Sequence, residues 1–219
     1  MATKAVLAEL ASVYQARSRR VVVIESVGGV DAVIRVQVGE PFDVVVLASD
    51  AIDKLLAAGH LVVGSRVDLV RCCVAVAVPA GAPRPEIGSP DALRRAVEAA
   101  PTIGTSTGPS GVALAKLFDR WGNAARIRDR IVTPPPGVAV GTLIARGEVA
   151  LGFQQLSELI HVAGVDVLGP LPPEIQIVTT FSAAVGTRAR QPDQARALLE
   201  FMASPAARYA KRRQGMEAA

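Results

Sequence analysis

The glycine- and hydroxyl-rich run from Thr105 to Gly111 has the residue types most suited to chemistry in this sequence. It precedes a segment in which apolar residues recur at helical spacing. The letters GTSTG at residues 104–108 fit the G-x-S-x-G template, in which a serine at a tight strand-to-helix turn is a nucleophile. The same composition is typical of a helix start that binds an anion through backbone N–H groups. Both interpretations are compared below.

Two further junctions, at residues 26–29 and 134–138, are also rich in small residues. A helix N-terminus carries about half a positive charge, and small residues let an anion come close to its N–H groups. In open α/β sheets the ligand lies at the carboxyl ends of the strands. One such junction is more often an ordinary helix cap. Three of them in one chain favour an anion site built from main-chain N–H groups.

The serine-hydrolase interpretation of Ser106 lacks partners. His161 is the only histidine downstream, and no HGGG-like oxyanion loop precedes the motif. Pro109 and the small residues up to Gly111 predict that the helix starts nearer Ser110 than Ser106. The run is also not a P-loop, because no G-K-[ST] follows it. Ser106, Ser110 and Gly111 are therefore predicted ligand contacts, and the hydrolase remains a remote alternative.

The composition predicts a folded protein with a hydrophobic core. Half of the 219 residues are hydrophobic, and the net charge is +4. This charge is compatible with a small anionic ligand, and no basic stripe interleaved with aromatics predicts nucleic-acid binding. Cys72 and Cys73 are adjacent in a strand-like run and would form a strained disulfide, so two reduced thiols are expected. No cofactor, metal site or direct membrane insertion is expected.

Alternating strand and helix patterns predict the α/β class with mostly parallel sheets. The run VVVIE, Val21 to Glu25, is predicted as a buried strand, and the apolar runs at residues 42–49, 69–81, 165–169 and 175–187 as further strands. Ser89 followed by Pro90 predicts a helix start. The Pro/Gly-dense segments 79–90 and 169–174 suggest two lobes. Lobe one is expected at 1–78 with 178–219, and lobe two at 79–177.

Four segments resemble the molybdate-type periplasmic solute-binding proteins of ABC transporters. They are VGEPFDVVVLASDAIDKLLAAGHLVVGSRVDL (38–69), GPSGVALAKLFDRWG (108–122), ARGEVALGFQQLSEL (145–159) and ARALLEFMASPAARYAKRRQG (195–215). Their order matches that family from about Ala2 to Gly215. The resemblance implies the type II periplasmic-binding-protein fold: two α/β lobes joined by two crossing strands, with a small anion in a ligand cleft between them.

The resemblance also implies which residues bind the ligand. Together with the contacts argued above, the predicted ligand residues are Ala2, Thr3, Gly28, Gly29, Ser106, Ser110, Gly111, Gly137, Val138, Gln154 and Gln155. The family commonly has a hydroxyl residue in place of Gly29, and molybdate binders often have a tyrosine in place of Gln155. Two glutamines could hydrogen-bond carboxylates, so a di- or tricarboxylate joins the oxyanions as a candidate ligand.

The N-terminus departs from the family, whose first strand precedes the first helix. Met1 lies where that strand should already have ended, so a truncated start is expected. No signal peptide is visible, which places the chain in the cytoplasm as it stands. A lost upstream signal peptide would place it in the periplasm.

Two functions follow from the resemblance. The first is solute binding for an ABC importer, with a permease as partner and a monomeric chain. The alternative is a cytosolic isomerase of a di- or tricarboxylate such as aconitate, because some relatives of these proteins have become such enzymes. Isomerisation needs a base, and Glu158, His161 and Asp50 are open candidates, none of which the sequence singles out.

Overall fold

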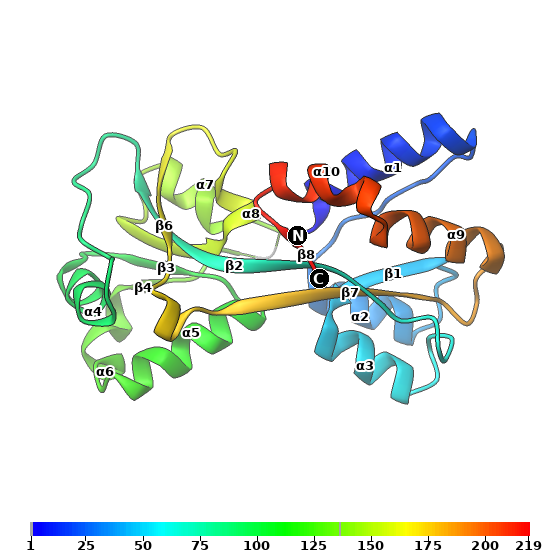
Figure 1. Ribbon diagram of the computed structural model, residues 1–219. Helices are drawn as coiled ribbons and strands as arrows, with labels where there is room; N and C mark the ends of the chain where they lie inside the picture. Colours follow the sequence, from blue (N-terminus) through cyan, green and yellow to red (C-terminus); the bar gives the residue numbers. More distant parts are fainter. Residues whose placement is uncertain (1, 136) are drawn as a thin grey trace. The chain divides into compact units, whose positions relative to one another are not determined.

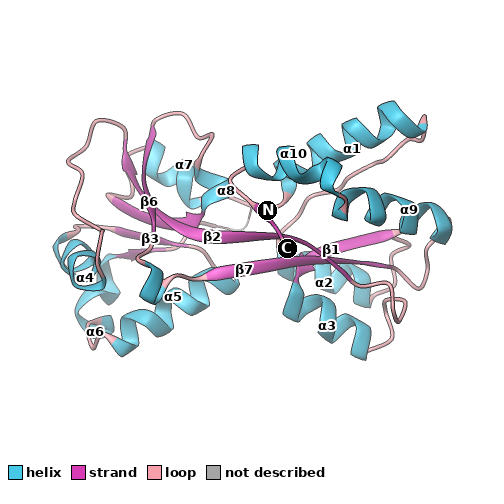
Figure 2. Ribbon diagram, viewed as in Figure 1, coloured by secondary structure: helices cyan, strands magenta, loops and turns pink. Residues whose placement is uncertain are grey.

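The computed structural model describes residues 2–135 and 137–219, and its chain forms two compact units (Figures 1 and 2). Unit 1 comprises Met1–Cys72 and Thr179–Ala219, and unit 2 comprises Cys73–Val178. The first division falls inside a long strand, a few residues before the expected boundary at 78. Among the described residues, no helix has the length and apolar character needed to cross a membrane.

Unit 1 contains short strands, and helices lie on both sides of these strands. Its strands are β1 (Val44–Ala48), the first part of β2 (Val67–Pro79), most of β7 (Val178–Val185) and β8 (Glu217–Ala218). Its helices are α1 (Lys4–Ser18), α2 (Gly29–Gln37), α3 (Ser49–Ala57), α9 (Pro192–Ala203) and α10 (Arg208–Arg213), with a 3-10 turn at Pro205–Ala207. Gly39 and Gly59 follow the ends of α2 and α3 with φ of +87° and +75°, the left-handed conformation that glycine adopts readily after a helix.

The two helical layers of unit 1 pack differently. Helices α2 and α3 cover β1 through a cluster that includes Ile52, Leu55 and Val45. On the other side, α1 packs against α9 and α10 (Figure 1). The rings of Tyr14 and Phe201 lie 5.4 Å apart in that layer. The part of the site that was predicted in this unit lies at the amino ends of α1 and α2.

The predicted buried strand at Val21–Glu25 is wrong. The segment is irregular, and Val21 and Val23 are 85% and 83% exposed. A run of β-branched residues forms a strand only when a neighbouring strand supplies hydrogen bonds. In the part of the chain that the structure describes, this segment pairs with no strand. The neighbouring strand β1 pairs, among the described residues, with β7 alone.

Lys211 is a buried cation of unit 1 that sequence patterning did not single out. Its side chain is 1% exposed, and its Nζ donates to the Leu69 carbonyl at 2.8 Å. Burial, together with the charge of Arg208, lowers the pKa of Lys211 from 10.5. The folded protein therefore binds fewer protons than the unfolded chain between the lowered pKa and 10.5.

This imbalance predicts that the free energy of unfolding rises with pH across that window, because the unfolded state binds more protons there. Lys211→Met should remove this part of the pH dependence. Urea denaturation of both proteins between pH 7 and 10.5 measures it. An unchanged pH slope in the variant would contradict the assignment of this effect to Lys211.

Unit 2 is an α/β layer structure with a mixed sheet. Its strands are the second part of β2, β3 (Ile103–Thr105), β4 (Ile131–Val132), β5 (Leu151–Gln155) and β6 (Val165–Pro170). Its helices are α4 (Pro90–Ala99), α5 (Pro109–Arg120), α6 (Ala124–Ile127), α7 (Val140–Ala145) and α8 (Leu156–Leu159), with 3-10 turns at Arg128–Arg130 and Pro173–Ile175. The predicted start of α4 is confirmed, because Ser89 Oγ accepts the Ala92 N–H at 3.2 Å.

The strand directions in unit 2 differ from the expectation of mostly parallel pairing. β3 is parallel to both β4 and β5, but β2 is antiparallel to β5 and to β6. In unit 1, β1 and β7 are also antiparallel. The parallel pairs are those joined through helices, whereas β2 and β7 contain the points at which the chain passes between the units.

Helices cover both faces of the unit 2 sheet (Figure 2). On one face, α4, α5 and α6 pack through Leu93, Leu114 and Phe118 against β2, β3 and β5. On the other face, α7 and α8 pack through Val140, Ile144 and Leu159. Glycines in the strands let α7 come close, because a Cβ on Gly152 would lie 2.3 Å from Ile144 Cδ1.

Gly152→Ala should therefore destabilise unit 2 by about 1–3 kcal/mol, the usual cost of overpacking a filled core. The added methyl group must push α7 away from β5 or force Ile144 off its rotamer. Chemical denaturation followed by the fluorescence of Trp121, the only tryptophan, measures the loss. Stability equal to that of the wild type would show that α7 does not pack this closely.

Candidate functional site

The carboxyl ends of β3, β4 and β5 lie at one edge of the unit 2 sheet. Ile103 of β3 is in register with Ile131 of β4 and with Leu151 of β5, and all three strands run in the same direction. The loops that follow them lead to α5, α7 and α8. Two of the three predicted small-residue junctions, together with the glutamine pair, are thus brought together at this edge.

The loop from β3 to α5 is folded tightly on itself. Helix α5 begins at Pro109, as predicted. Its N-cap residue is Gly108, which has no side chain that could accept a bond from the first N–H groups of the helix. The hydroxyls of Ser106 and Ser110 are 3.2 Å apart, and Ser110 is 7% exposed. A Cβ on Gly111 would lie only 1.7 Å from the Ser106 carbonyl oxygen. Only glycine at 111 lets the chain fold back so that both serines lie at the start of α5.

The junction from β4 to α7 is a proline-rich turn. Gly137 is exposed with φ of +80°, and the N–H of Val138 donates to the Pro135 carbonyl at 3.1 Å. Pro136, which belongs to the predicted junction, lies outside the described residues. Val138 is partly buried and packs against the cluster under α7. The turn places the first residues of α7 beside the end of β5.

Gln154 and Gln155, at the end of β5, are each 4% exposed. Neighbouring strand residues point to opposite faces of a sheet, so the two amides do not form one pair. Gln154 Oε1 accepts the Gly141 N–H of α7 at 3.0 Å, and the Gln154 side chain also hydrogen-bonds Glu158 of α8. Burial raises the pKa of Glu158 above its ordinary value, and the Gln154 hydrogen bond opposes that rise.

The three loop segments at this edge, residues 105–111, 133–141 and 154–158, are free of lysine and arginine in sequence. The groups able to hold an anion here are hydroxyls, amides and the N–H groups of loops and helix starts. Among the described residues, no group of three or more His, Cys, Asp and Glu side chains is arranged to hold a metal ion.

The predicted residues of unit 1 lie at helix starts. Gly28 is the N-cap of α2, and a Cβ on Gly29 would be 4.0 Å from Leu47 near the carboxyl end of β1. Thr3 is the N-cap of α1 without a side-chain capping bond, and Ala2 is buried. These positions remain predictions as ligand contacts.

A hydrogen-bonded chain at the end of β1 was not predicted. Ser49 Oγ donates to the Thr180 carbonyl at 3.0 Å and lies 2.7 Å from Ser182 Oγ. Ser182 is fully buried and donates to Asp68 Oδ1 at 2.5 Å. Because three separate strands or strand ends contribute to it, no local sequence signal could have revealed it. These hydrogen bonds hold Ser49, the first residue of α3, against β7.

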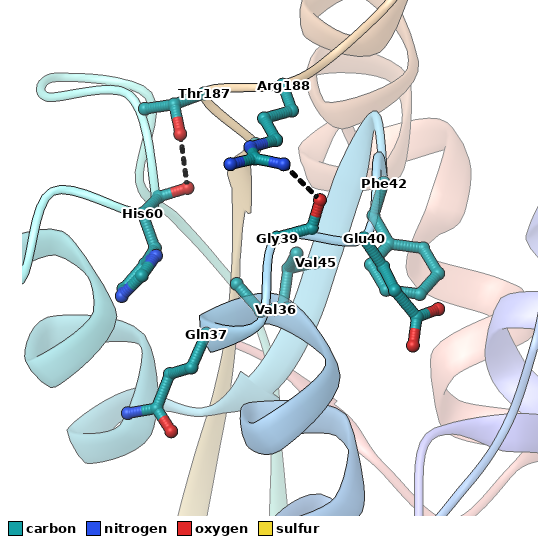
Figure 3. Close-up of a pocket in the computed structure, with 10 residues that line it drawn as sticks. Val36, Gln37, Gly39, Glu40, Phe42, Val45, His60, Thr187 and Arg188 are labelled. Atoms are coloured by element: carbon teal, nitrogen blue, oxygen red, sulfur yellow. Dashed lines mark hydrogen bonds between the residues drawn. The ribbon is translucent and has the colours of Figure 1, made fainter.

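A hollow of unit 1 lies at the amino end of β1, the end opposite Ser49 (Figure 3). It is lined by Val36, Gln37, Gly39, Glu40, Phe42, Val45, His60, Gly186, Thr187 and Arg188. Thr187 Oγ1 donates to the His60 carbonyl at 3.0 Å, and Arg188 Nη1 to the Gly39 carbonyl at 2.9 Å. None of the predicted ligand residues lines this hollow.

The serine-hydrolase alternative gains no support from this geometry. The hydroxyl partner of Ser106 is Ser110. His161 is exposed and follows α8. A nucleophilic serine needs a base within hydrogen-bond reach, and in the described part of the chain Ser106 bonds to Ser110 and not to His161.

The family assignment follows from comparison with known proteins. Residues 1–217 match the profile described as bacterial extracellular solute-binding protein. The chain belongs to this family. It is also 42% identical over 168 residues to an aconitate isomerase of a Pseudomonas species, an alignment covering 75% of this chain and 63% of the relative. The chain thus spans less than two thirds of that relative's length.

Solved structures agree with the family and with the type II fold. The periplasmic molybdate-binding protein of Azotobacter vinelandii matches with a TM-score of 0.83 and 21% identity, covering 99% of this chain and 96% of that one. The sulfate-binding protein of Mycobacterium tuberculosis matches with a TM-score of 0.78 and 19% identity, covering 98% and 83%. At these identities the likeness establishes the fold class, which confirms the sequence prediction.

Proposed function

We propose that this solute-binding protein holds a small anion at the carboxyl ends of β3, β4 and β5. The observation that carries the proposal is the convergence of three loops without lysine or arginine at one edge of unit 2. Hydroxyls and N–H groups fixed in such loops can bind an anion without first losing side-chain freedom. The molybdate- and sulfate-binding relatives support an anionic ligand for this chain.

We further propose a carboxylate as the ligand. Gln155 lies at the end of β5, on the sheet face opposite Gln154, and an amide group donates well to carboxylate oxygens. The aconitate isomerase, at 42% identity, supports an unsaturated tricarboxylate in particular. Molybdate, tungstate and sulfate are the competing class.

Thermal-shift and calorimetric titrations test this proposal with cis- and trans-aconitate, citrate, molybdate, tungstate and sulfate. A ligand that binds only the folded protein at 100 times its dissociation constant should stabilise it by about 2.7 kcal/mol. We expect this for a tricarboxylate and not for the tetrahedral oxyanions. Stabilisation by molybdate alone would show that the ligand is a tetrahedral oxyanion and not a carboxylate. No stabilisation by any of these anions would refute anion binding.

The role of the bound anion has two candidates. Family membership supports delivery to an ABC permease after export, and the isomerase relative supports catalysis on the same fold. An importer should leave the ligand chemically unchanged, whereas an isomerase should convert one aconitate isomer into the other. Incubation of the purified chain with trans-aconitate, followed by proton NMR, separates the two. Loss of labelled-ligand uptake after gene deletion would support import.

Gly29→Val tests the prediction that the start of α2 contacts the ligand. The nearest atom to a Cβ at Gly29 is 4.0 Å away, so the substitution should leave stability within about 0.5 kcal/mol of the wild type. If the N–H groups at the start of α2 contact the ligand, the bulkier residue should weaken binding at least about tenfold, or 1.4 kcal/mol. Calorimetry measures the affinity. Unchanged affinity would remove Gly29 from the site.

A further inference from the structure

We propose that Glu158 is the proton-transferring group of this protein, and that Gln154 positions it, in an allylic isomerisation of an unsaturated carboxylate. The inference rests on the proposed carboxylate ligand and goes beyond it by naming the reaction and the residue. It starts from a hydrogen-bonded chain at the edge of unit 2. The chain runs from Gly141 in the first turn of α7, through Gln154 at the end of β5, to Glu158 in α8.

The orientation of Gln154 is fixed by its neighbours. Its Oε1 accepts the Gly141 N–H at 3.0 Å, so the amide NH₂ is the group left to donate to Glu158. Gln154 is 4% exposed, and rotating its amide would leave the Gly141 N–H buried without this partner. The amide therefore holds the Glu158 carboxylate in place from one side.

Close packing reinforces this arrangement. A Cβ on Gly141 would lie 3.4 Å from the Glu158 carbonyl oxygen and from Leu159, so α7 and α8 are in direct contact there. Glu158 is partly buried, and burial raises its pKa above the ordinary value, which makes its carboxylate a stronger base than an exposed one. This position is three residues after the end of β5, at the edge where the ligand is proposed.

The other two candidates are less suited to this role. His161 and Asp50 are both exposed. Asp50 belongs to unit 1 and lies 4.0 Å from Lys54 in an exposed helical ion pair. A general base must reach its substrate in a site that limits access of water. Of the three, Glu158 has both the burial and a hydrogen-bond partner that fixes its carboxylate.

The reaction balances without any added reagent. In aconitate, a CH₂ group lies between one carboxylate and the C=C bond. Glu158 takes one proton from this CH₂, and the electron pair of the broken C–H bond spreads over the allylic carbons and the attached carboxylates. Protonated Glu158 exchanges its proton with solvent and then gives a proton to the former vinylic carbon, which forms a new C–H bond and moves the double bond by one position.

The loops at the same edge would stabilise the intermediate charge. The developing negative charge spreads onto the carboxylates, and fixed N–H and hydroxyl donors bind a more negative carboxylate more tightly. Ser106 and Ser110 are such donors in unit 2. Glu158 would thus act on carbon while the loop residues bind oxygen.

The test uses the full chain, trans-aconitate as the probe, and ²H₂O as solvent. The wild type should interconvert the isomers and incorporate solvent deuterium at carbon, detected by NMR. Glu158→Gln should lower the rate by about 10²- to 10⁴-fold and still bind trans-aconitate by calorimetry. Gln154→Met should lower kcat with KM nearly unchanged, because it releases Glu158 without removing the carboxylate. His161→Gln serves as the exposed control and should retain the wild-type rate.

The outcomes separate the two proposals. No carboxylate binding by the wild type overturns the proposed function and this inference together. Binding without interconversion overturns only this inference. Interconversion without deuterium at carbon, or at full rate in Glu158→Gln, also overturns it. If circular dichroism shows that Glu158→Gln does not fold, Glu158→Asp replaces it. The proposal then requires both a slower reaction in Glu158→Asp and deuterium at carbon in the wild-type product.

Discussion

Gly111→Ala should weaken anion binding at least about 100-fold, a loss of about 2.7 kcal/mol. The alanine Cβ would lie 1.7 Å from the Ser106 carbonyl oxygen and 2.7 Å from its carbonyl carbon. Both are main-chain atoms, so the clash cannot be relieved by a side-chain rotation. The loop from Ser106 to Ser110 must move, and the serine hydroxyls lose their spacing. A site that relies on fixed donors loses its affinity when the donors shift.

The control is Gly88→Ala in the same unit. Gly88 is exposed, and no atom lies within 4 Å of its Cβ position. This variant should bind as the wild type does. Calorimetric titration with the anion that stabilises the wild type measures both variants. Equal affinity of Gly111→Ala and the wild type would show that the Ser106–Ser110 loop is not part of the site.

Phe118→Ala should cost about 3–5 kcal/mol of folding free energy, the usual range for removing a buried aromatic ring. Phe118 is 1% exposed, and its ring packs edge-on against Phe153 of β5 with centroids 6.0 Å apart. This contact joins α5 to the central parallel strands. The loss is a large part of the roughly 5–15 kcal/mol that stabilises an ordinary domain.

Urea denaturation followed by Trp121 fluorescence suits this measurement, because Trp121 packs against the same cluster. Val112→Ala on the same helix is the control. Val112 is 54% exposed, so its truncation should change stability by no more than about 0.5 kcal/mol. A loss below about 1 kcal/mol for Phe118→Ala would mean that α5 is not anchored through this ring. Anion binding should also weaken, since α5 carries Ser110.

Much of the fold was predictable because its signals are local. Ser89 with Pro90 marks a helix start, and the apolar runs at 42–49 and 69–81 mark β1 and β2, as the structure confirms. The strand predicted at Val21–Glu25 failed for a non-local reason. Its composition favours a strand, but strand formation depends on a neighbour, which no local pattern guarantees.

The site was predictable in position more than in detail. Small residues after β3 and β4 indicated the edge of unit 2 at which the loops gather. The roles of the glutamines were not predictable, because they depend on contacts between separate elements. Gln154 is held by Gly141, thirteen residues away, and this bond turns its amide toward Glu158. The chain through Ser49, Ser182 and Asp68 depends on still longer separations.

The central claim is that an anion is held by the main-chain N–H groups and hydroxyls after β3, β4 and β5. Titration of the ¹⁵N-labelled protein with trans-aconitate, followed residue by residue in amide NMR spectra, tests it most directly. We predict that the largest shifts in unit 2 fall on the amides of residues 106–111 and 137–141. Saturable shifts confined to the hollow around His60 and Arg188, with these two loops unchanged, would contradict the claim.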